Sequence, residues 1–447
     1  MNRAVLAGVA GALMATCSSL AGAQEAVAPA VYIHAGQLLA EPGEAPRGAS
    51  TVIVRGGVVA EVRDGFAPPE EGAELVDLSG HFVLPGLIDM HVHLLGVGGD
   101  PVRARLTAIN RDQQDDLLEG VSNARTTLMA GFTTVRDLGS NERSIRALRD
   151  AAAAGWIEAP TIVNAGRGIT VSGGHGDSSN GLAERYAATH SHQENTCDGA
   201  EDCARAVRRQ VGLGAEVIKF MATGGVLSNV SGGLGRAMTP EEMRAIMDTA
   251  HGLGRKVAAH SHAAQGTRAA VEAGVDTIDH GSFLDDETIA LIKQRGTWLV
   301  PTMMAPAAAV AQAEAGMLPP AVIPKAREAA AAARESHRRA IAAGVKIAFG
   351  TDSGVSRHGD NAQEFALMVE AGMSPAAAIR AATVDAAQAL GRPDSIGRIA
   401  PGMAADLIAV AGDPLADVRR LEEVAFVMKA GRVALHEGQR PPANGAR

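Results

Sequence analysis

The 447-residue sequence predicts a (β/α)8 TIM barrel joined to a small composite β-sandwich domain built from both termini. Three observations lead to this prediction. From residue 82 onward, short apolar strand-like segments alternate with amphipathic helical segments, which is the pattern of a parallel α/β fold. Eight such units occupy about 270 residues, as in a barrel. Further β-like segments precede and follow them.

The first residues have the layout of a secretory signal peptide. Arg3 precedes an apolar run that is too short to span a bilayer, and a small-residue ending closes at Ala23. We therefore predict that residues 1–23 are removed and that the protein is secreted or periplasmic, with no membrane span. Cys17 is an alternative lipid-attachment site, but Thr16 before it fits that interpretation poorly.

The composite domain is predicted from residues 24–81 and 395–440, and residues 441–447 are predicted to be a disordered tail. Gly56-Gly57 and Ala430-Gly431-Arg432 are hairpin signals between strand candidates. The strand candidates are residues 31–34, 50–54, 56–62, 75–78, 405–410 and 424–434.

Residues 82–394 are predicted to form the barrel. Helix signals support this prediction, because Thr239 and Pro240 open one helical segment and Gly274 closes another. The strand candidates are residues 82–94, 133–138, 160–165, 216–222, 256–262, 277–282, 297–303 and 346–354. The helical segments are residues 112–130, 140–154, 197–212, 239–253, 266–273, 285–295, 324–343 and 375–390.

Composition excludes some classes of partner. The formal net charge is -9 and the chain has no basic runs, which argues against a nucleic-acid partner. The moderate charge and the abundance of alanine and glycine are typical of a globular enzyme. We expect a small-molecule substrate.

Two cysteines remain after the signal peptide, Cys197 and Cys203. They lie close together in a polar stretch, and in an oxidising compartment such a pair is expected to form a disulfide. The alternative is two free thiols. A metal role is disfavoured because no histidine follows at zinc-finger spacing.

His91 and His93 are the first candidate site residues. They end an apolar segment that reads as a buried strand, in which side chains two residues apart point to the same side. Two imidazoles on one side of a strand suit zinc and its neighbours in the first transition row. Alone, the pattern is weak, because two histidines in a polar turn would look the same.

Other ligand-type residues strengthen this interpretation because they also lie at the ends of predicted strands. Barrel enzymes carry their catalytic groups at the carboxyl ends of the strands. A barrel without a site would not be expected to place all of these residues there. They are His260 and His262 on the fifth strand, His280 on the sixth and Asp352 on the eighth.

Lys219 lies inside an apolar strand, where an unpaired ammonium is costly. In one interpretation the side chain reaches the end of the strand and pairs with an acidic residue. In the other, the amine takes up carbon dioxide and becomes a carbamate, which is an anionic ligand able to bridge two cations.

These residues together resemble the amidohydrolase superfamily, over essentially the whole mature chain. The flanking segments 83–89 and 402–407 are similar to that superfamily too. The chain looks most like its secreted branch of metal-dependent dipeptidase and carboxypeptidase-like enzymes, which includes prolidase-like and ochratoxinase-like amidohydrolases. The segments that support this branch are residues 172–177, 222–228 and 278–282.

The resemblance implies two divalent metal ions, which in this family are usually zinc. His91, His93 and Asp352 would bind the more buried ion, and His262 and His280 would bind the other. Carboxylated Lys219 and a hydroxide would bridge them. His260 shares a strand side with His262 and is the alternative ligand, or else a supporting or packing residue.

The resemblance also implies roles in the reaction. Asp352 would take a proton from the attacking hydroxide and deliver it to the leaving amine. His175, in a glycine-rich loop, would bind the substrate or the developing oxyanion, although a loop histidine without a role is an equal alternative. The residues that would contact the substrate carboxylate through backbone N–H groups, unless the glycine serves only the turn, are Gly225, Val226, Leu227 and Ser228.

The predicted activity is hydrolysis of the amide bond in dipeptides or N-acyl amino acids with a free carboxylate, with ochratoxin A as one member of this class. The alternative is a cyclic-amide hydrolase or deaminase similar to imidazolonepropionase. Such enzymes use one metal, lack the lysine and carry Glu where this chain has Gln265. A non-catalytic binding protein is disfavoured by the complete ligand set. By resemblance alone, a homo-oligomer is expected.

Overall fold

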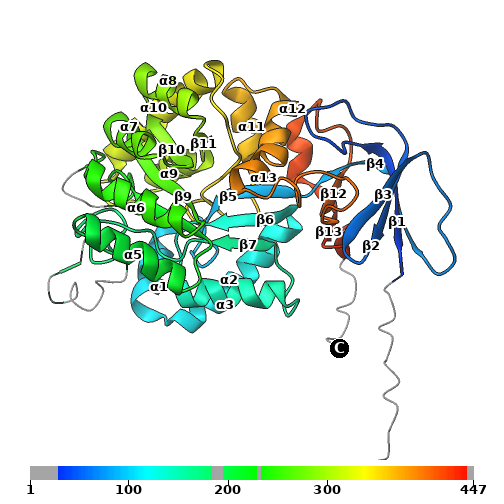
Figure 1. The fold of residues 1–447 in the computed structure, drawn as a ribbon, viewed down its shortest axis with the longest axis horizontal. Helices are drawn as coiled ribbons and strands as arrows, with labels where there is room; N and C mark the ends of the chain where they lie inside the picture. Colours follow the sequence, from blue (N-terminus) through cyan, green and yellow to red (C-terminus); the bar gives the residue numbers. More distant parts are fainter. Residues whose placement is uncertain (1–28, 181, 184, 186–194, 229–232, 440–447) are drawn as a thin grey trace, which may run out of the picture.

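The computed structural model describes residues 29–180, 182–183, 185, 195–228 and 233–439. The predicted signal peptide, Cys17 and the predicted tail therefore lie outside the described residues. Within them, no helix combines the length and the apolar character needed to cross a membrane. Helices surround parallel strands in one part of the molecule, and a sheet built from both ends of the chain lies beside them (Figure 1).

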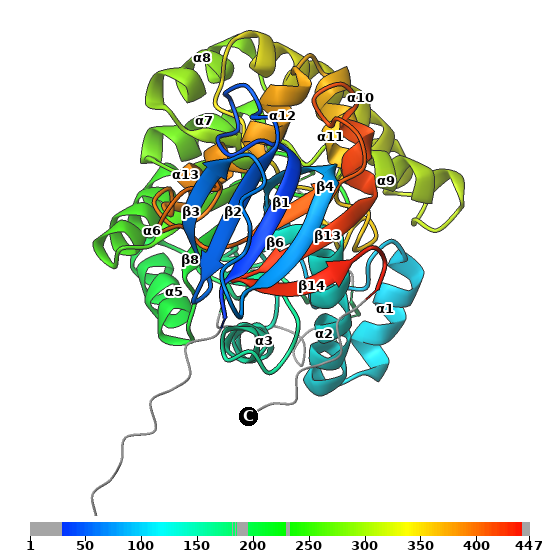
Figure 2. The same ribbon diagram turned by 90° about the vertical axis from the view of Figure 1, so that its right-hand side faces the viewer.

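The terminal segments form one seven-stranded sheet, which Figure 2 shows nearly face-on. The prediction was a sandwich, but all seven strands are hydrogen-bonded into this single sheet. Strands β1 and β4 pair in parallel, and the other neighbours are antiparallel. In spatial order the strands are β14 (Arg432–His436), β13 (Val424–Lys429), β12 (Leu407–Val410), β4 (Glu74–Pro85), β1 (Val31–Leu38), β2 (Ser50–Arg55) and β3 (Val58–Asp64).

The single first barrel strand predicted over residues 82–94 is wrong, because the chain changes sheet at Gly86. Strand β4 runs to Pro85 and pairs with β12, whereas β5 (Leu87–Val92) begins the parallel sheet. The Gly86 N–H donates to Asp406 O at 2.9 Å, and an added Cβ would collide with the Thr133 side chain. Gly86 is therefore the point at which the terminal sheet and the first parallel sheet lie in close contact.

The parallel strands follow the predicted order along the chain. One sheet holds β5, β6 and β7, and a second holds β8, β9, β10 and β11, with all neighbours parallel. The bounds of the strands after β5 are β6 (Phe132–Asp137), β7 (Thr161–Asn164), β8 (Val217–Met221), β9 (Lys256–Ala263), β10 (Thr277–Phe283) and β11 (Trp298–Val300).

The predicted eighth strand, residues 346–354, is not a regular strand. Its backbone still contacts both neighbours, since Leu299 N donates to Lys346 O and Met90 N donates to Phe349 O, both at 2.9 Å. At Asp352 the backbone turns left-handed, with φ 60°, and beyond it Ser353 still forms an isolated parallel bridge with Val92. The two parallel sheets are thus linked by isolated bridges, of which one is Ile169 to Phe220.

Helices occupy the connections between the strands. The predicted cap of α6 is present, because Thr239 Oγ1 accepts from Glu242 N at 3.2 Å while the Glu242 carboxylate accepts from Thr239 N. Gly274 ends α7 in the left-handed conformation, as predicted. The helices are α1 (Pro101–Asn110), α2 (Gln113–Met129), α3 (Glu142–Ala153), α5 (Ala200–Gly212), α6 (Pro240–Gly252), α7 (Ala264–Ala273), α8 (Asp286–Arg295), α9 (Met304–Glu314), α10 (Ile323–Ala342), α11 (Gln363–Glu370), α12 (Pro375–Ala381), α13 (Val384–Leu390) and the 3-10 helix η1 (Val418–Glu422).

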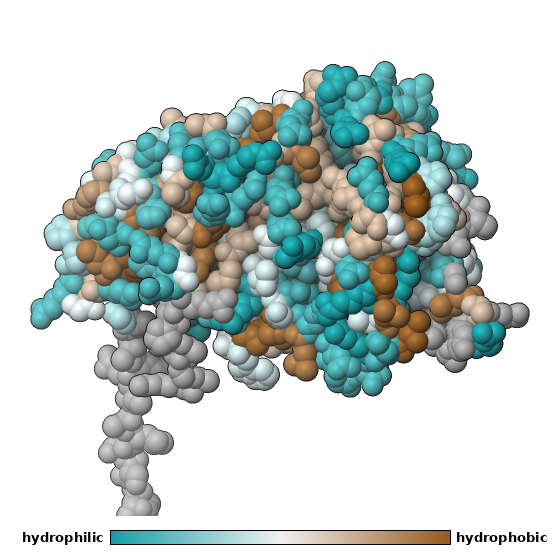
Figure 3. Space-filling view, turned by 180° about the vertical axis from the view of Figure 1, so that it is seen from behind, coloured by the Kyte–Doolittle hydropathy of each residue, from teal (hydrophilic) through white to brown (hydrophobic). Residues whose placement is uncertain are grey.

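The surface mixes polar and apolar side chains. Hydrophilic residues are interspersed with small hydrophobic patches on the face seen from behind (Figure 3). Helix α1 buries none of its residues and exposes Leu106 and Ile109, while α2 exposes Leu118. Inside, the largest apolar cluster spans the parallel strands and their helices, and a second fills the terminal sheet.

Cys197 and Cys203 form a disulfide at the start of α5. This confirms the pairing predicted from their spacing and excludes the alternative of two free thiols.

The break between the sheets gives a stability prediction. In Gly86→Ala, the new Cβ meets Thr133, so we expect overpacking to cost about 1–3 kcal/mol and to lower Tm in a thermal melt. Gly48→Ala is the matched control, because nothing lies within 4 Å of its added Cβ. An equal Tm for both variants would contradict the close joining of the two parts at Gly86.

Candidate metal centre

The first donor group consists of His91, His93 and Asp352, whose ligand atoms all lie within 4.8 Å of one another. His91 lies on β5 and His93 just beyond it. Asp352 Oδ1 is 3.5 Å from His91 Nε2 and 3.0 Å from His93 Nε2. The group therefore offers two imidazole nitrogens and one carboxylate oxygen to a common point.

Asp89 supports the first donor group through hydrogen bonds that its carboxylate accepts. Its Oδ1 accepts from the N–H groups of His91 and Thr351, and its Oδ2 accepts from Thr351 Oγ1 at 2.7 Å and Asn361 Nδ2 at 2.8 Å. Because Thr351 precedes Asp352, these bonds tie the last segment of the parallel fold to β5. They hold Asp352 in its unusual left-handed conformation.

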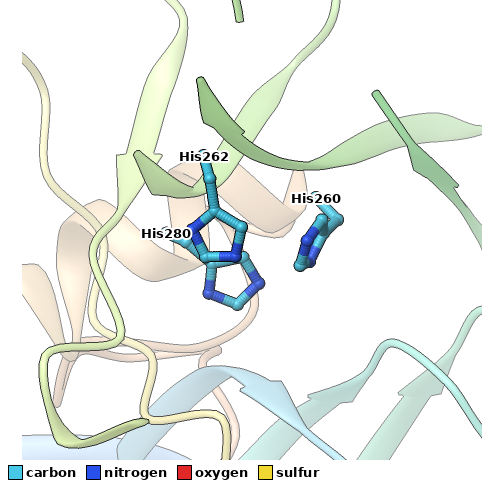
Figure 4. A group of neighbouring side chains, drawn as sticks. All are labelled: His260, His262 and His280. Atoms are coloured by element: carbon cyan, nitrogen blue, oxygen red, sulfur yellow. The ribbon is translucent and has the colours of Figure 1, made fainter. Parts of the chain in front are cut away.

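The second donor group consists of His260 and His262 on β9 and His280 on β10 (Figure 4). The His262 and His280 rings stack with centroids 5.0 Å apart, and His260 lies 4.6 Å from His280. The first group is adjacent, since the His91 and His280 centroids are 5.1 Å apart. Two donor groups thus share one location.

Hydroxyl groups fix two of these rings. His262 Nδ1 contacts Ser282 Oγ, and His280 Nδ1 contacts Thr302 Oγ1, each at 2.8 Å. Each contact leaves Nε2 of that ring available. Outer contacts of this kind orient histidine ligands in metal sites.

His260 lies within the second donor group together with His262, although the sequence analysis assigned the ligand role to His262 and kept His260 as the alternative. The two residues share a side of β9. In the described part of the chain, the buried His260 Nε2 has no hydrogen-bond partner. His260 is therefore equally able to offer a nitrogen to an ion.

Lys219 is buried on β8, with its side chain only 2% exposed, so it does not reach solvent at the strand end. Its Nζ lies 2.6 Å from Asp279 Oδ2. Burial lowers the pKa of the Lys219 amine, against the opposing effect of Asp279. The structure thus shows the ion pair that one interpretation of the sequence expected, at a position facing the donor groups.

Sequence analysis missed Asp279 and its second partner, Arg136. Arg136 is fully buried on β6 and places Nη2 3.1 Å from Asp279 Oδ1. The signal was available, because each is a charged residue within a strand, which is the feature that drew attention to Lys219.

His175 comes from the loop after β7 and contacts the second donor group. Its ring centroid is 4.3 Å from that of His260, and a Cβ added at Gly225 would collide with it. The predicted loop Gly225–Ser228 therefore lies next to His175, where Ser228 Oγ donates to Gly225 O at 3.1 Å. The site residues predicted from the sequence are thus brought together.

Burial keeps most of these imidazoles neutral. Desolvation, followed by neighbouring cationic groups, lowers the pKa of His91, His260 and His280 well below the ordinary value, and that of His262 to about 3. His93 differs: burial alone would lower its pKa, but the Asp352 carboxylate raises it to about 8. Neutral imidazole is the form that binds metal.

The residues fit a pair of divalent cations. His260 Nε2 is buried and lacks a hydrogen-bond partner in the described part of the chain, so the protein leaves it unsatisfied. Nitrogen and carboxylate oxygen donors in this number suit zinc and its neighbours.

Comparisons with known proteins identify the family of this chain. The amidohydrolase family model matches residues 82–434. Ochratoxinase from Aspergillus niger is 31% identical over 452 residues, which cover 94% of this chain and 90% of that protein.

Two solved structures share the fold. The crystal structure of a Xaa-Pro dipeptidase with bound methionine in the active site gives a TM-score of 0.85 at 36% identity, covering 90% of this chain and 99% of that one. A prolidase complexed with N-methylphosphonate-L-proline gives 0.82 at 28% identity, covering 91% and 100%. These similarities imply an α/β fold that contains a TIM barrel. The chain therefore belongs to the amidohydrolase superfamily, in its prolidase-like and ochratoxinase-like branch.

Proposed function

We propose that this protein hydrolyses amide bonds with two divalent metal ions, with zinc as the favoured metal. The observation that carries the proposal is the adjacency of the two donor groups, whose His91 and His280 rings lie 5.1 Å apart. One group would hold each ion. Lys219, buried on β8 and within electrostatic reach of both groups, would supply the bridge after carboxylation.

The position of Lys219 supports carboxylation. Only the neutral amine attacks carbon dioxide, and burial favours that form. The nitrogen forms a bond to carbon and releases one proton, so the product is a carbamate anion. That anion adds the negative charge that two cations require next to the mostly neutral imidazoles.

The chain's own residues would then carry the reaction. When bound, the metal pair would supply hydroxide at neutral pH and polarise the scissile carbonyl. Asp352, which reaches both His91 and His93, would accept the proton of the nucleophile and deliver it to the leaving amine. His175, held beside His260, would contact the carbonyl oxygen as negative charge develops there.

The proposed substrates are dipeptides and N-acyl amino acids with a free carboxylate, ochratoxin A included. Lys325 supports this choice, since its Nζ donates to Ser228 O at 2.7 Å, in the loop beside His175. No acidic residue in the described part of the chain pairs with Lys325. A partly buried cation at that loop is suited to an anionic end of the substrate.

An activity similar to imidazolonepropionase is the second candidate, and two residues count against it. This chain carries Lys219 in the interior and Gln265 where a glutamate would be expected.

We also propose that the parallel strands, which begin at Leu87, form one closed barrel, and that the seven-stranded sheet of the terminal segments forms the composite domain. Arg136, Lys219 and Asp279 support closure, because they come from the second, fourth and sixth parallel strands and meet inside. Side chains of alternate strands meet in this way within barrels.

Metal removal is the first prediction. Dialysis against a strong chelator is expected to abolish amide hydrolysis, because the neutral imidazoles alone generate no nucleophile. Restoration should require two equivalents of zinc per chain, measured by elemental analysis beside turnover. Full hydrolysis in verified metal-free protein would rule out the mechanism.

Substitution of the bridge is the second prediction. We expect Lys219→Ala to lower kcat by more than the roughly 10- to 100-fold typical for loss of an outer partner of a metal site. Lys346→Ala is the matched control, because that exposed lysine lies over Trp298 on the outside of the strands. Near-normal turnover in Lys219→Ala, with two ions bound, would exclude the bridging role.

The third prediction concerns the substrate carboxylate. We expect Lys325→Met to raise KM about tenfold, or roughly 1.4 kcal/mol, for a dipeptide with a free carboxylate, and to leave KM unchanged for its carboxamide. Lys293→Met is the control. Lys293 also donates to a backbone carbonyl, Ala343 O, but it lies in the last turn of α8 and not at the loop beside His175. Equal KM changes for both substrates would show that Lys325 does not read the carboxylate.

A further inference from the structure

A buried ion-pair network lies beneath the two donor groups. Arg136 on β6 donates to Met90 O at 2.6 Å, to Thr277 Oγ1 at 3.1 Å and to Asp279 Oδ1 at 3.1 Å. These contacts fix the guanidinium between β5 and β10. One oxygen of Asp279 thus contacts a cation that is also held by a backbone acceptor on β5 and a side-chain acceptor on β10.

The second oxygen of Asp279 faces the proposed ligands. Asp279 Oδ2 lies 2.6 Å from Lys219 Nζ and 3.5 Å from His91 Nδ1. A single carboxylate oxygen therefore adjoins the proposed bridging residue and a residue of the first donor group. Asp279 also precedes His280, so its backbone positions the second group.

We propose that Asp279 is a positioning residue that holds Lys219 and His91 for metal binding, with Arg136 as its fixed counter-ion. This inference rests on the proposed function. Histidine ligands commonly direct their second ring nitrogen to a carboxylate, which orients the ring and raises its basicity. Each ring nitrogen of His91 has a carboxylate oxygen beside it, because Nε2 lies 3.5 Å from Asp352 Oδ1 and Nδ1 lies 3.5 Å from Asp279 Oδ2.

The same oxygen serves Lys219 before and after carboxylation. When the amine adds carbon dioxide, the nitrogen gains a bond to carbon, loses one proton and keeps one N–H. Asp279 Oδ2 can accept from that remaining N–H as it accepts from the amine. The contact would set the plane of the carbamate and so the direction of its two oxygens.

Arg136 explains how an acid can serve here. A buried carboxylate without a cation is costly, and carboxylation removes the cation that Lys219 supplies. Arg136 stays charged under all ordinary conditions, so Asp279 remains paired after the lysine becomes an anion. Before carboxylation the network contains two cations, Arg136 and Lys219. After carboxylation Arg136 is its one cation.

Asp279→Asn is the central experiment, because it keeps the size of the side chain and removes its charge. We expect zinc affinity, measured by competition with a chromogenic chelator, to fall about 10- to 100-fold. The carbamate signal of Lys219, measured by 13C NMR in 13C-labelled bicarbonate, should weaken in parallel. Asp276→Asn is the control, since Asp276 precedes the same strand but pairs with His251 and Lys256 away from the donor groups.

A double variant separates positioning from folding. Arg136→Gln with Asp279→Asn removes the guanidinium and the carboxylate together, so Lys219 is the one buried charge left in the network, whereas Asp279→Asn alone leaves two unpaired cations. We expect it to fold by circular dichroism and still bind zinc weakly. Wild-type zinc affinity and carbamate signal in either folded variant would overturn the inference. A wild-type protein that binds no zinc would overturn the proposed function itself, and this inference with it.

Discussion

The contact between Lys219 and Asp279 is the interaction on which the rest of the site depends. A cation and an anion buried inside parallel strands are tolerated only as a pair, so their strands must be correctly placed for the fold to form. The pair joins β8 to β10, and Arg136 extends it to β6. The charges that hold the strands together therefore lie next to the groups that we propose for catalysis, since Asp279 is beside His91 and precedes His280.

Backbone strain is concentrated at the donor groups that adjoin the network of Arg136, Lys219 and Asp279. His280, Thr302 and Asp352 all have positive φ although none is glycine, and each lies at or beside a donor group. Such conformations persist only where surrounding contacts enforce them. For Asp352 these contacts come from Asp89 through Thr351, and for the His280 backbone from His337, whose Nε2 lies 2.5 Å from His280 O. The strain is the cost of turning side chains toward one point from strands that run in the same direction.

The sequence predicted most strands and the residues that gather at the site, because burial and alternation are local signals. It did not reveal Asp279 as the partner of Lys219, since pairing across β9 depends on the curvature of the whole sheet. The eighth strand is irregular for a related reason: residues 346–354 bridge β11 at Ile347 and β5 at Ser353, and the left-handed conformation of Asp352 between these bridges is enforced from outside the segment. Pro85-Gly86 is a local turn signal, but it does not reveal that the segments before and after it belong to different sheets.

The contrast between His91 and His93 shows what the donor groups lack. Both rings lie near Asp352, yet only His93 has a raised pKa. Burial lowers the pKa of His91 and the nearby Lys219 lowers it further, whereas at His93 the closer Asp352 carboxylate outweighs burial. Below about pH 8 the proton on His93 balances the Asp352 carboxylate, as a bound cation would. A metal ion entering this group must displace that proton, so its affinity should rise with pH up to that value. The carboxylate that holds a proton on His93 in this structure is thus the same group that would hold the metal.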